Sequence, residues 1–213
     1  MKAFFLLLIS FVVINAHSQT TITEGKIVYT IAMFDSATKK DIDPSKNQTM
    51  TVYFKGDMER VEGVVIDKGV NEVIIIGNKT YSFITLIDSM GKKVAVVSAV
   101  EDVNSEHGIQ RKKNFVDLNV TKIILGHTCK GVMFDNQYWL GTIFLFYTSD
   151  YYIHLLNPIY YTYDKVNGFV MSIEQYMFGL AIRCTVTSIS DQKVDDSMFE
   201  IPSDYQIKNL KDK

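Results

Sequence analysis

The sequence predicts an all-β protein, and three observations lead to that fold class. Residues 25–34 alternate apolar and polar side chains, which is typical of a half-buried strand. Further β-branched and aromatic runs follow along most of the chain. Gly, Asn and Asp punctuate these runs at intervals of about eight to twelve residues, which is the spacing of an antiparallel meander, sandwich or barrel. We therefore expect one antiparallel domain of about nine to eleven strands with one or two short helical turns.

The expected strands of the first half come in pairs. Residues 49–67 predict two strands joined near Lys55–Gly56–Asp57, and residues 70–88 predict two more. The second pair has Gly77–Asn78 between its strands, and both residues tolerate positive φ, so this dipeptide favours a two-residue hairpin. Residues 92–100 continue the series.

The second half begins after a polar interruption. Residues 101–114 lack period-2 alternation, and we expect a surface excursion with a helical turn there. Near the C-terminus, acidic residues and Ser197 precede Pro202, which favours a short helical turn over residues 195–200. The tail after Tyr205 is charged, and we expect it to be frayed. Five more strands are expected between these segments, at residues 120–126, 127–134, 141–149, 168–177 and 180–190.

The N-terminus has the pattern of a secretory signal peptide. Lys2 precedes an apolar run from Ala3 to Ile14, and Ala16 and Ser18 then have the A-x-S spacing of a cleavage site. The run is shorter than the ~20 residues that span a bilayer. We predict cleavage after Ser18, which divides the chain into a signal peptide (1–18) and a single β-rich domain (19–213). The mature protein is expected to be exported, soluble and not membrane-spanning, either in the periplasm or outside the cell.

Charge excludes one class of partner. The formal net charge is −2, and no basic patch with interleaved aromatic residues occurs, so we expect no binding to nucleic acid.

His127 and Cys129 are the pair that most resembles a chemical site. Their i, i+2 spacing on a strand places them on one face, where a metal clip or a Cys–His nucleophile is conceivable. A zinc site needs three or four protein ligands, and no further His or Cys has a matching spacing. Apolar residues surround Cys129, whereas a reactive thiolate needs a polar pocket. We therefore expect a packed strand, with no metal, no cofactor and no catalytic residues.

Cys129 and Cys184 both fall in the middle of expected strands. In an exported protein they could form a disulfide, which would contribute ~4 kcal/mol in the chain-entropy model. The alternative is two buried free thiols on separate strands, and the sequence does not choose between them.

Aromatic residues concentrate between Tyr138 and Tyr163. Three interpretations are open: a lid or rim over an apolar groove, a flat platform for sugar rings, and a segment that completes the core. The first predicts that the groove is lined by Phe144, Phe146, Tyr151, Tyr152, Tyr160 and Tyr161.

Four segments, in order, resemble a family of small secreted proteins of unknown function from Bacteroidota, the relatives of the GLPGLI type. They are Gly25-Lys26-Ile27-Val28-Tyr29, Ile124-Leu125-Gly126-His127-Thr128-Cys129-Lys130, Phe146-Tyr147-Thr148, and the set Val194, Phe199, Ile201, Pro202 and Tyr205. His127 replaces the aromatic residue of the family, and residues 167–171 lack the proline of its G-L-P-G-L-I box. The resemblance implies a half-barrel similar to the LolA/LolB lipoprotein carriers, a curved antiparallel sheet whose concave face holds an acyl chain.

These observations lead us to expect a non-enzymatic, exported protein that binds an apolar small molecule or a lipidated protein in a concave groove. A cavity-free module for protein–protein interaction in the cell envelope is the alternative. A hydrolase is a residual alternative for which the sequence nominates no nucleophile and base.

Overall fold

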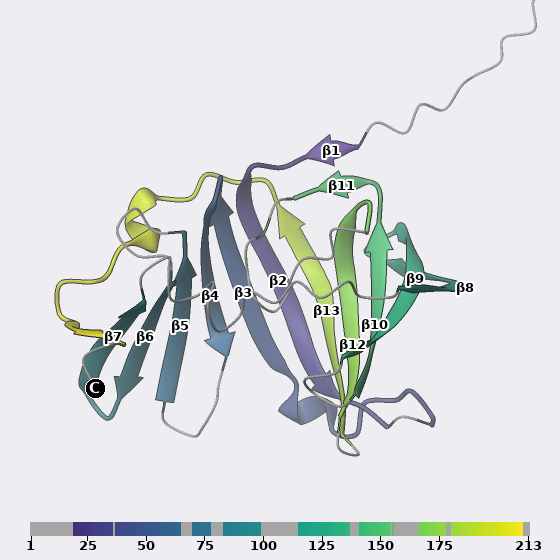
Figure 1. The fold of residues 1–213 in the computed structure, drawn as a ribbon, viewed down its shortest axis with the longest axis horizontal. Helices are drawn as coiled ribbons and strands as arrows, with labels where there is room; N and C mark the ends of the chain where they lie inside the picture. The colour runs from purple at the N-terminus through teal and green to yellow at the C-terminus, as the bar shows by residue number, and fades with distance from the viewer. Residues whose placement is uncertain are drawn as a thin grey trace, which may run out of the picture.

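The structure is a computed structural model, and its strands form one open sheet of twelve strands and a second sheet of two (Figure 1). Outside the strands, the described residues include the short 3-10 helices η1 (Pro44–Lys46) and η3 (Asp196–Phe199). The expected β-rich class and the helical turn near residue 197 are thus confirmed. The structure describes residues 19–35, 37–64, 70–77, 83–98, 115–136, 141–153, 155, 166–177 and 180–210.

The strands fall into an N-terminal and a C-terminal series. The first is β1 (Thr20–Thr21), β2 (Glu24–Met33), β3 (Gln48–Lys55), β4 (Met58–Val64), β5 (Val70–Ile76), β6 (Phe83–Ser89) and β7 (Lys92–Ser98). The second is β8 (Val116–Ile124), β9 (His127–Asn136), β10 (Gly141–Thr148), β11 (Tyr151–Tyr152), β12 (Phe169–Met177), β13 (Leu180–Ser190) and β14 (Gln206–Asn209).

The large sheet consists of two meanders that meet at one seam. Its order is β14-β7-β6-β5-β4-β3-β2-β13-β12-β10-β9-β8, so that each meander runs outward from the pair β2–β13 (Figure 1). The seam is antiparallel and pairs Tyr29 with Val186 and Ile31 with Cys184. The first and last long strands of the chain therefore lie side by side in the middle of the sheet.

Two expectations about the sheet are wrong. The described residues already contain fourteen strands instead of nine to eleven, because the two-residue strands β1 and β11 and the four-residue strand β14 carry no periodic pattern of their own. The sheet is also not wholly antiparallel, since β14 runs parallel to β7 and β1 runs parallel to β11. The tail after Tyr205, expected to be frayed, supplies β14.

The expected connections have mixed outcomes. Lys55 pairs with Met58, so the turn at Gly56–Asp57 is confirmed. Ile76 pairs with Phe83, whereas a two-residue hairpin at Gly77–Asn78 would pair Ile76 with Lys79. That hairpin is therefore wrong; its Asn78 and the polar excursion at 101–114 lie outside the described residues.

One side of the large sheet is apolar across eight neighbouring strands, from β5 to β9. Residues directly opposite each other in a sheet share a face, so the register identifies this side. One row is Ile74, Val61, Val52 and Ile27. A second row is Ile31, Cys184, Ile173, Leu145 and Val132. We call the side formed by these two rows the apolar face, and all of its members belong to one packed cluster.

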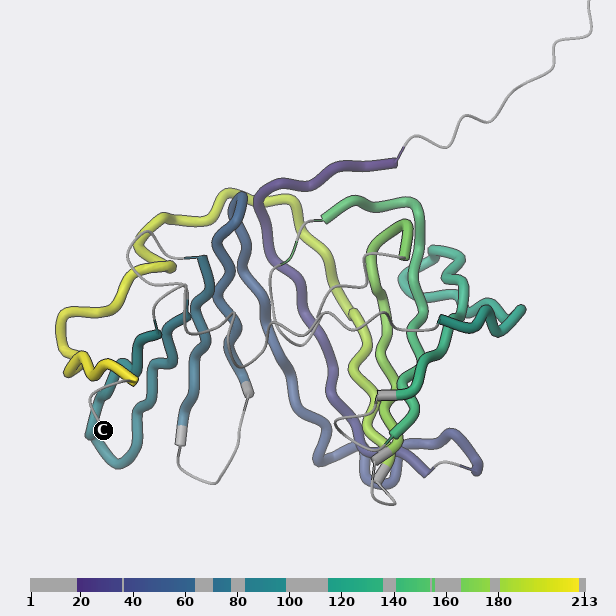
Figure 2. The backbone as a smooth tube through the Cα atoms, in the orientation of Figure 1, coloured from purple at the N-terminus to yellow at the C-terminus, as the bar shows by residue number. Residues whose placement is uncertain are grey.

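The opposite side of β5–β7 is covered by the C-terminal segment. After β13 the chain crosses back to the N-terminal meander, where Val194 and Phe199 pack against Ile75, Ile84 and Val97. Figure 2 shows this segment, in yellow, running from the end of β13 to the side of β7. The C-terminal segment thus gives this half of the sheet a second core.

Candidate functional site

A tight hairpin fixes the position of His127. Leu125 and Gly126 connect β8 to β9, and both have positive φ, 51° and 83°. Two left-handed residues in a row form the hairpin turn whose twist matches that of the strands. Ile124 therefore pairs with His127, and the imidazole stands at the first position of β9.

The end of β10 lies beside the start of β9. The two strands are antiparallel, and Tyr147 pairs with Lys130. Asp150 and Tyr151, which follow β10, therefore reach the same end of the sheet as His127. The parallel pair β1–β11 closes this end, where the Thr20 amide donates to the Asp150 carbonyl at 2.8 Å.

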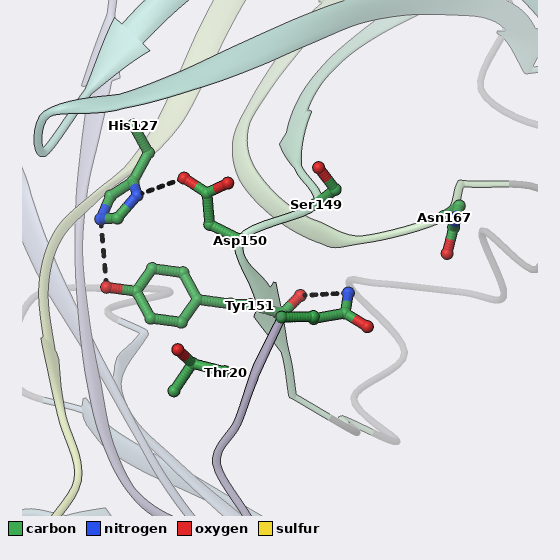
Figure 3. A pocket seen from close by; sticks show the side chains of 7 residues that line it. Thr20, His127, Ser149, Asp150, Tyr151 and Asn167 are labelled. Atoms are coloured by element: carbon green, nitrogen blue, oxygen red, sulfur yellow. Dashed lines mark hydrogen bonds and ion pairs between the residues drawn. The ribbon is translucent and has the colours of Figure 1, made fainter. Parts of the chain in front are cut away.

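His127, Asp150 and Tyr151 form a hydrogen-bonded chain (Figure 3). The distance from His127 Nδ1 to Asp150 Oδ2 is 2.6 Å, and that from Tyr151 OH to His127 Nε2 is 3.1 Å. The Tyr151 and His127 rings also meet edge to face, with centroids 4.8 Å apart. Because a carboxylate only accepts, Nδ1 carries the proton in the neutral imidazole, and Nε2 accepts from the tyrosine hydroxyl.

These three residues line an open pocket of about 420 Å³. Its other lining residues are Gln19, Thr20, Ser149 and Asn167, all of which carry hydroxyl or amide groups (Figure 3). Gln19 Nε2 donates to the Tyr151 carbonyl at 3.2 Å, which ties the start of the described chain to the pocket wall. The pocket is therefore polar and built from chain segments far apart in the sequence.

Cys129 takes no part in this chemistry. It is fully buried in β9, and its thiol donates to the His127 carbonyl at 3.6 Å while both imidazole nitrogens engage Asp150 and Tyr151. Burial, together with a smaller effect of the Asp150 charge, raises the pKa of Cys129 to about 11. A Cys–His nucleophile would need the opposite shift. Cys129 belongs to a packed strand, whereas His127 faces the pocket.

Cys129 and Cys184 are free thiols in the structure. They lie on β9 and β13, with β10 and β12 between them. Three steps between neighbouring strands cover about 14 Å, whereas a disulfide needs Cα atoms within about 7 Å. Of the two alternatives left by the sequence, the structure has the free thiols.

Of the predicted groove residues, Phe146 belongs to the same packed cluster as the apolar face, and Phe144 and Tyr151 pack against that cluster. Phe144 and Phe146 lie within β10 and face away from Leu145 and the apolar face, whereas Tyr151 lines the pocket and Tyr152 is 52% exposed beside it. Phe144 packs edge to face on Tyr176, and the Lys122 ammonium stands 3.8 Å above the Phe146 ring. Tyr160 and Tyr161 lie outside the described residues.

A charged network occupies this second side of the C-terminal meander. Glu174, whose side chain is 6% exposed, accepts from Lys122 at 2.5 Å and from Arg183 at 3.1 Å. Arg183 also reaches Asp41 at 3.4 Å. Burial alone would raise the pKa of Glu174, but the hydrogen bonds and charges of Lys122 and Arg183 outweigh it and hold that pKa below 4.5.

Sequence reasoning missed most of the pocket. It singled out His127 and Tyr151, each for a different reason, and did not connect either with Asp150, Ser149 or Asn167. A signal was available, because pairing the expected strands 127–134 and 141–149 as a hairpin brings residues 149–151 next to His127. The contribution of Gln19 and Thr20 comes from the β1–β11 pair and had no signal in the sequence.

The described residues contain no group of three or more His, Cys, Asp or Glu side chains placed to hold a metal ion. They also contain no helix with the length and hydrophobicity needed to span a membrane.

Comparison with known proteins gives similarity at the level of fold. No protein-family model matches the chain, and no curated protein sequence matches it. A solved structure of PNGF-II is similar, with a TM-score of 0.55 and 18% identity over 88% of this chain and 31% of that one. The chain therefore spans about a third of the length of PNGF-II.

Two further solved structures are similar over most of their own length. The lipoprotein LppX of Mycobacterium tuberculosis has a TM-score of 0.44 and 10% identity, over 82% of this chain and 89% of that one. A DUF1329 family protein from Desulfovibrio piger has a TM-score of 0.38 and 9% identity, over 84% of this chain and 90% of that one.

The likeness to PNGF-II shows that this fold also occurs as part of a longer protein.

Proposed function

We propose that this chain is an exported, non-enzymatic protein of the cell envelope that binds an apolar ligand, such as an acyl chain, against its apolar face. One observation carries the proposal: eight neighbouring strands present apolar side chains to the same side of one open sheet. Each methylene that a ligand buries there contributes about 0.8 kcal/mol. The resemblance to GLPGLI-type proteins and to lipoprotein carriers agrees with this function.

The architecture of the described residues is compatible with a ligand on the apolar face. In a β-sandwich a second sheet of similar size covers such a face. Within the described residues, the second sheet consists of β1 and β11 alone, each two residues long. Neither strand is long enough to cover eight strands of the large sheet.

One observation favours the second candidate, a cavity-free interaction module. Ile27, Val52 and Leu145, in the middle of the apolar face, are 0% exposed with no ligand present. A face that is already covered has less room for an acyl chain. The fold shared with part of PNGF-II also agrees with a role as a module.

The first test is mass spectrometry of an organic extract of the mature protein, purified from its native envelope without detergent. We expect a lipid near one equivalent per chain that is missing from a β-sandwich protein of similar size processed in parallel. An extract with no such lipid, together with no uptake of a fluorescent fatty acid, would favour the interaction module.

A matched pair of variants locates the ligand. Ile31 and Val28 are both partly buried on β2 but point to opposite sides, Ile31 to the apolar face. Ile31→Trp adds bulk where the acyl chain would lie. We therefore expect fluorescent fatty acid uptake to fall at least about tenfold, which corresponds to the loss of a few methylene contacts. Val28→Trp should leave uptake unchanged. Equal uptake by both variants would place the ligand elsewhere.

A further inference from the structure

The pocket at His127 has a lining made mostly of neutral hydrogen-bonding groups. None of its seven lining residues is Lys or Arg, and Asp150 provides a carboxylate. The predicted cleavage after Ser18 would add the α-ammonium group of Gln19, so the lining of the mature chain would carry one charge of each sign. Charge alone therefore favours neither an anionic nor a cationic ligand.

The hydrogen-bonding groups of the lining discriminate further. Hydroxyl, amide and neutral imidazole groups each donate and accept, and they make up the lining apart from Asp150. The Gln19 amide nitrogen already donates to the Tyr151 carbonyl, and both His127 nitrogens engage Asp150 and Tyr151. The other lining groups include the hydroxyls of Thr20 and Ser149 and the amide of Asn167. An ammonium ligand only donates and would not match the Asn167 amide donor, whereas a ligand hydroxyl donates and accepts and can pair with each of these groups.

We propose that this pocket binds a neutral ligand with several hydroxyl groups, such as a sugar ring, with the Tyr151 hydroxyl as its central contact. The volume of about 420 Å³ lies in the range of small-molecule sites. The pocket is distinct from the apolar face, and sugar binding in the pocket does not depend on whether that face holds an acyl chain.

The hydrogen bonds Asp150–His127–Tyr151 fix the position of the Tyr151 hydroxyl. Asp150 faces Nδ1 of His127, and the Tyr151 hydroxyl donates to Nε2, so its oxygen can accept from a ligand in the pocket. The thiol of Cys129 contacts the backbone carbonyl of His127 instead.

The experiment is saturation-transfer NMR on the mature chain with glucose, galactose, mannose and N-acetylglucosamine, and with methylammonium and acetate as charged probes. We expect at least one sugar to bind saturably and more tightly than either charged probe. Tyr151→Phe keeps the ring against His127 and removes the hydroxyl. It should weaken sugar binding about fivefold, which corresponds to the loss of one neutral hydrogen bond. Asn167→Ala, an exposed lining residue, should also weaken it.

The matched control is Tyr152→Phe, which removes the same hydroxyl from the neighbouring residue outside the lining. It should bind as the unmodified chain does, and all variants should show one cooperative unfolding transition. The proposal is overturned if methylammonium or acetate binds more tightly than every sugar, if no sugar saturates, or if Tyr152→Phe weakens binding as much as Tyr151→Phe.

Discussion

At the residue scale, the two cysteines show how environment decides reactivity. Both lie within strands, and burial raises the pKa of Cys129 to about 11 and that of Cys184 to about 12. The thiolate is the reactive form, so both side chains behave as small apolar groups at neutral pH. His127, only two residues from Cys129, instead has both ring nitrogens hydrogen-bonded at the pocket.

We predict that iodoacetamide at about pH 8 modifies neither cysteine in the folded protein, because thiolate is scarce at both sites. In urea without a reductant, both thiols should react, and the intact mass should rise by two carbamidomethyl groups. Labelling of one thiol in the folded state would contradict the burial argument. Absence of labelling in urea would instead indicate a disulfide.

Gly131 is a second residue whose identity follows from its neighbours. It stands opposite Phe146 in the β9–β10 pair, and a Cβ at this position would lie 3.1 Å from the Phe146 ring and 2.9 Å from Val120. The glycine therefore lets Phe146 lie flat across β9, under the ammonium of Lys122.

At the element scale, β8, β12 and β13 are joined by the charges of Lys122, Glu174 and Arg183. Glu174 pairs with Arg183 in the register and accepts from Lys122 three strands further on. Since the folded pKa of Glu174 lies below 4.5, this carboxylate stabilises the fold at pH values above its unfolded pKa. The contribution is lost as the pH falls through the lower, folded pKa.

Glu174→Gln should therefore lower the free energy of unfolding at neutral pH by about 2 kcal/mol, because Lys122 and Arg183 lose their carboxylate. The loss should shrink below about pH 4, where the glutamate itself becomes protonated. Urea denaturation across this pH range provides the measurement. Glu62→Gln, at the more exposed pair with Arg60, is the control and should cost less. A pH-independent loss would rule out the charge explanation.

The success of sequence-based prediction also depends on the element. Long strands such as β2 and β13 were predicted within about two residues of their bounds because their side chains alternate with local regularity. β1, β11 and β14 were not predicted, because each is short and is defined by pairing with a strand more than a hundred positions away in the sequence. The pocket depends on β1 and β11, which is why only part of it was foreseeable.

At the scale of the whole molecule, the C-terminal segment connects the end of the chain to the N-terminal meander. Phe199 is 1% exposed and packs in the cluster with Ile75 and Ile84, and Lys55 reaches Asp196 at 2.6 Å. The helical turn η3 therefore covers the side of β5–β7 that faces away from the apolar face, and strand β14 pairs with β7 at the edge of the sheet.

We predict that Phe199→Ala lowers the free energy of unfolding by about 3–5 kcal/mol, through lost burial and the cavity it leaves. Ile207→Ala, at a half-exposed position of β14, should cost less than about 0.5 kcal/mol. Urea denaturation of both variants tests this difference. Similar losses for the two would show that the cluster around Phe199 contributes little.

The seam between β2 and β13 also governs the order in which the molecule can be completed. When the chain is synthesised or exported from its N-terminal end, β2 is present early. One edge of β2 then pairs with β3, and the other edge stays unpaired until β13 is available. The loop that must close before Tyr29 meets Val186 contains most of the protein, so its closure entropy opposes early assembly. The final fold is therefore reached only when nearly the whole chain is present, and refolding should take milliseconds to seconds rather than microseconds.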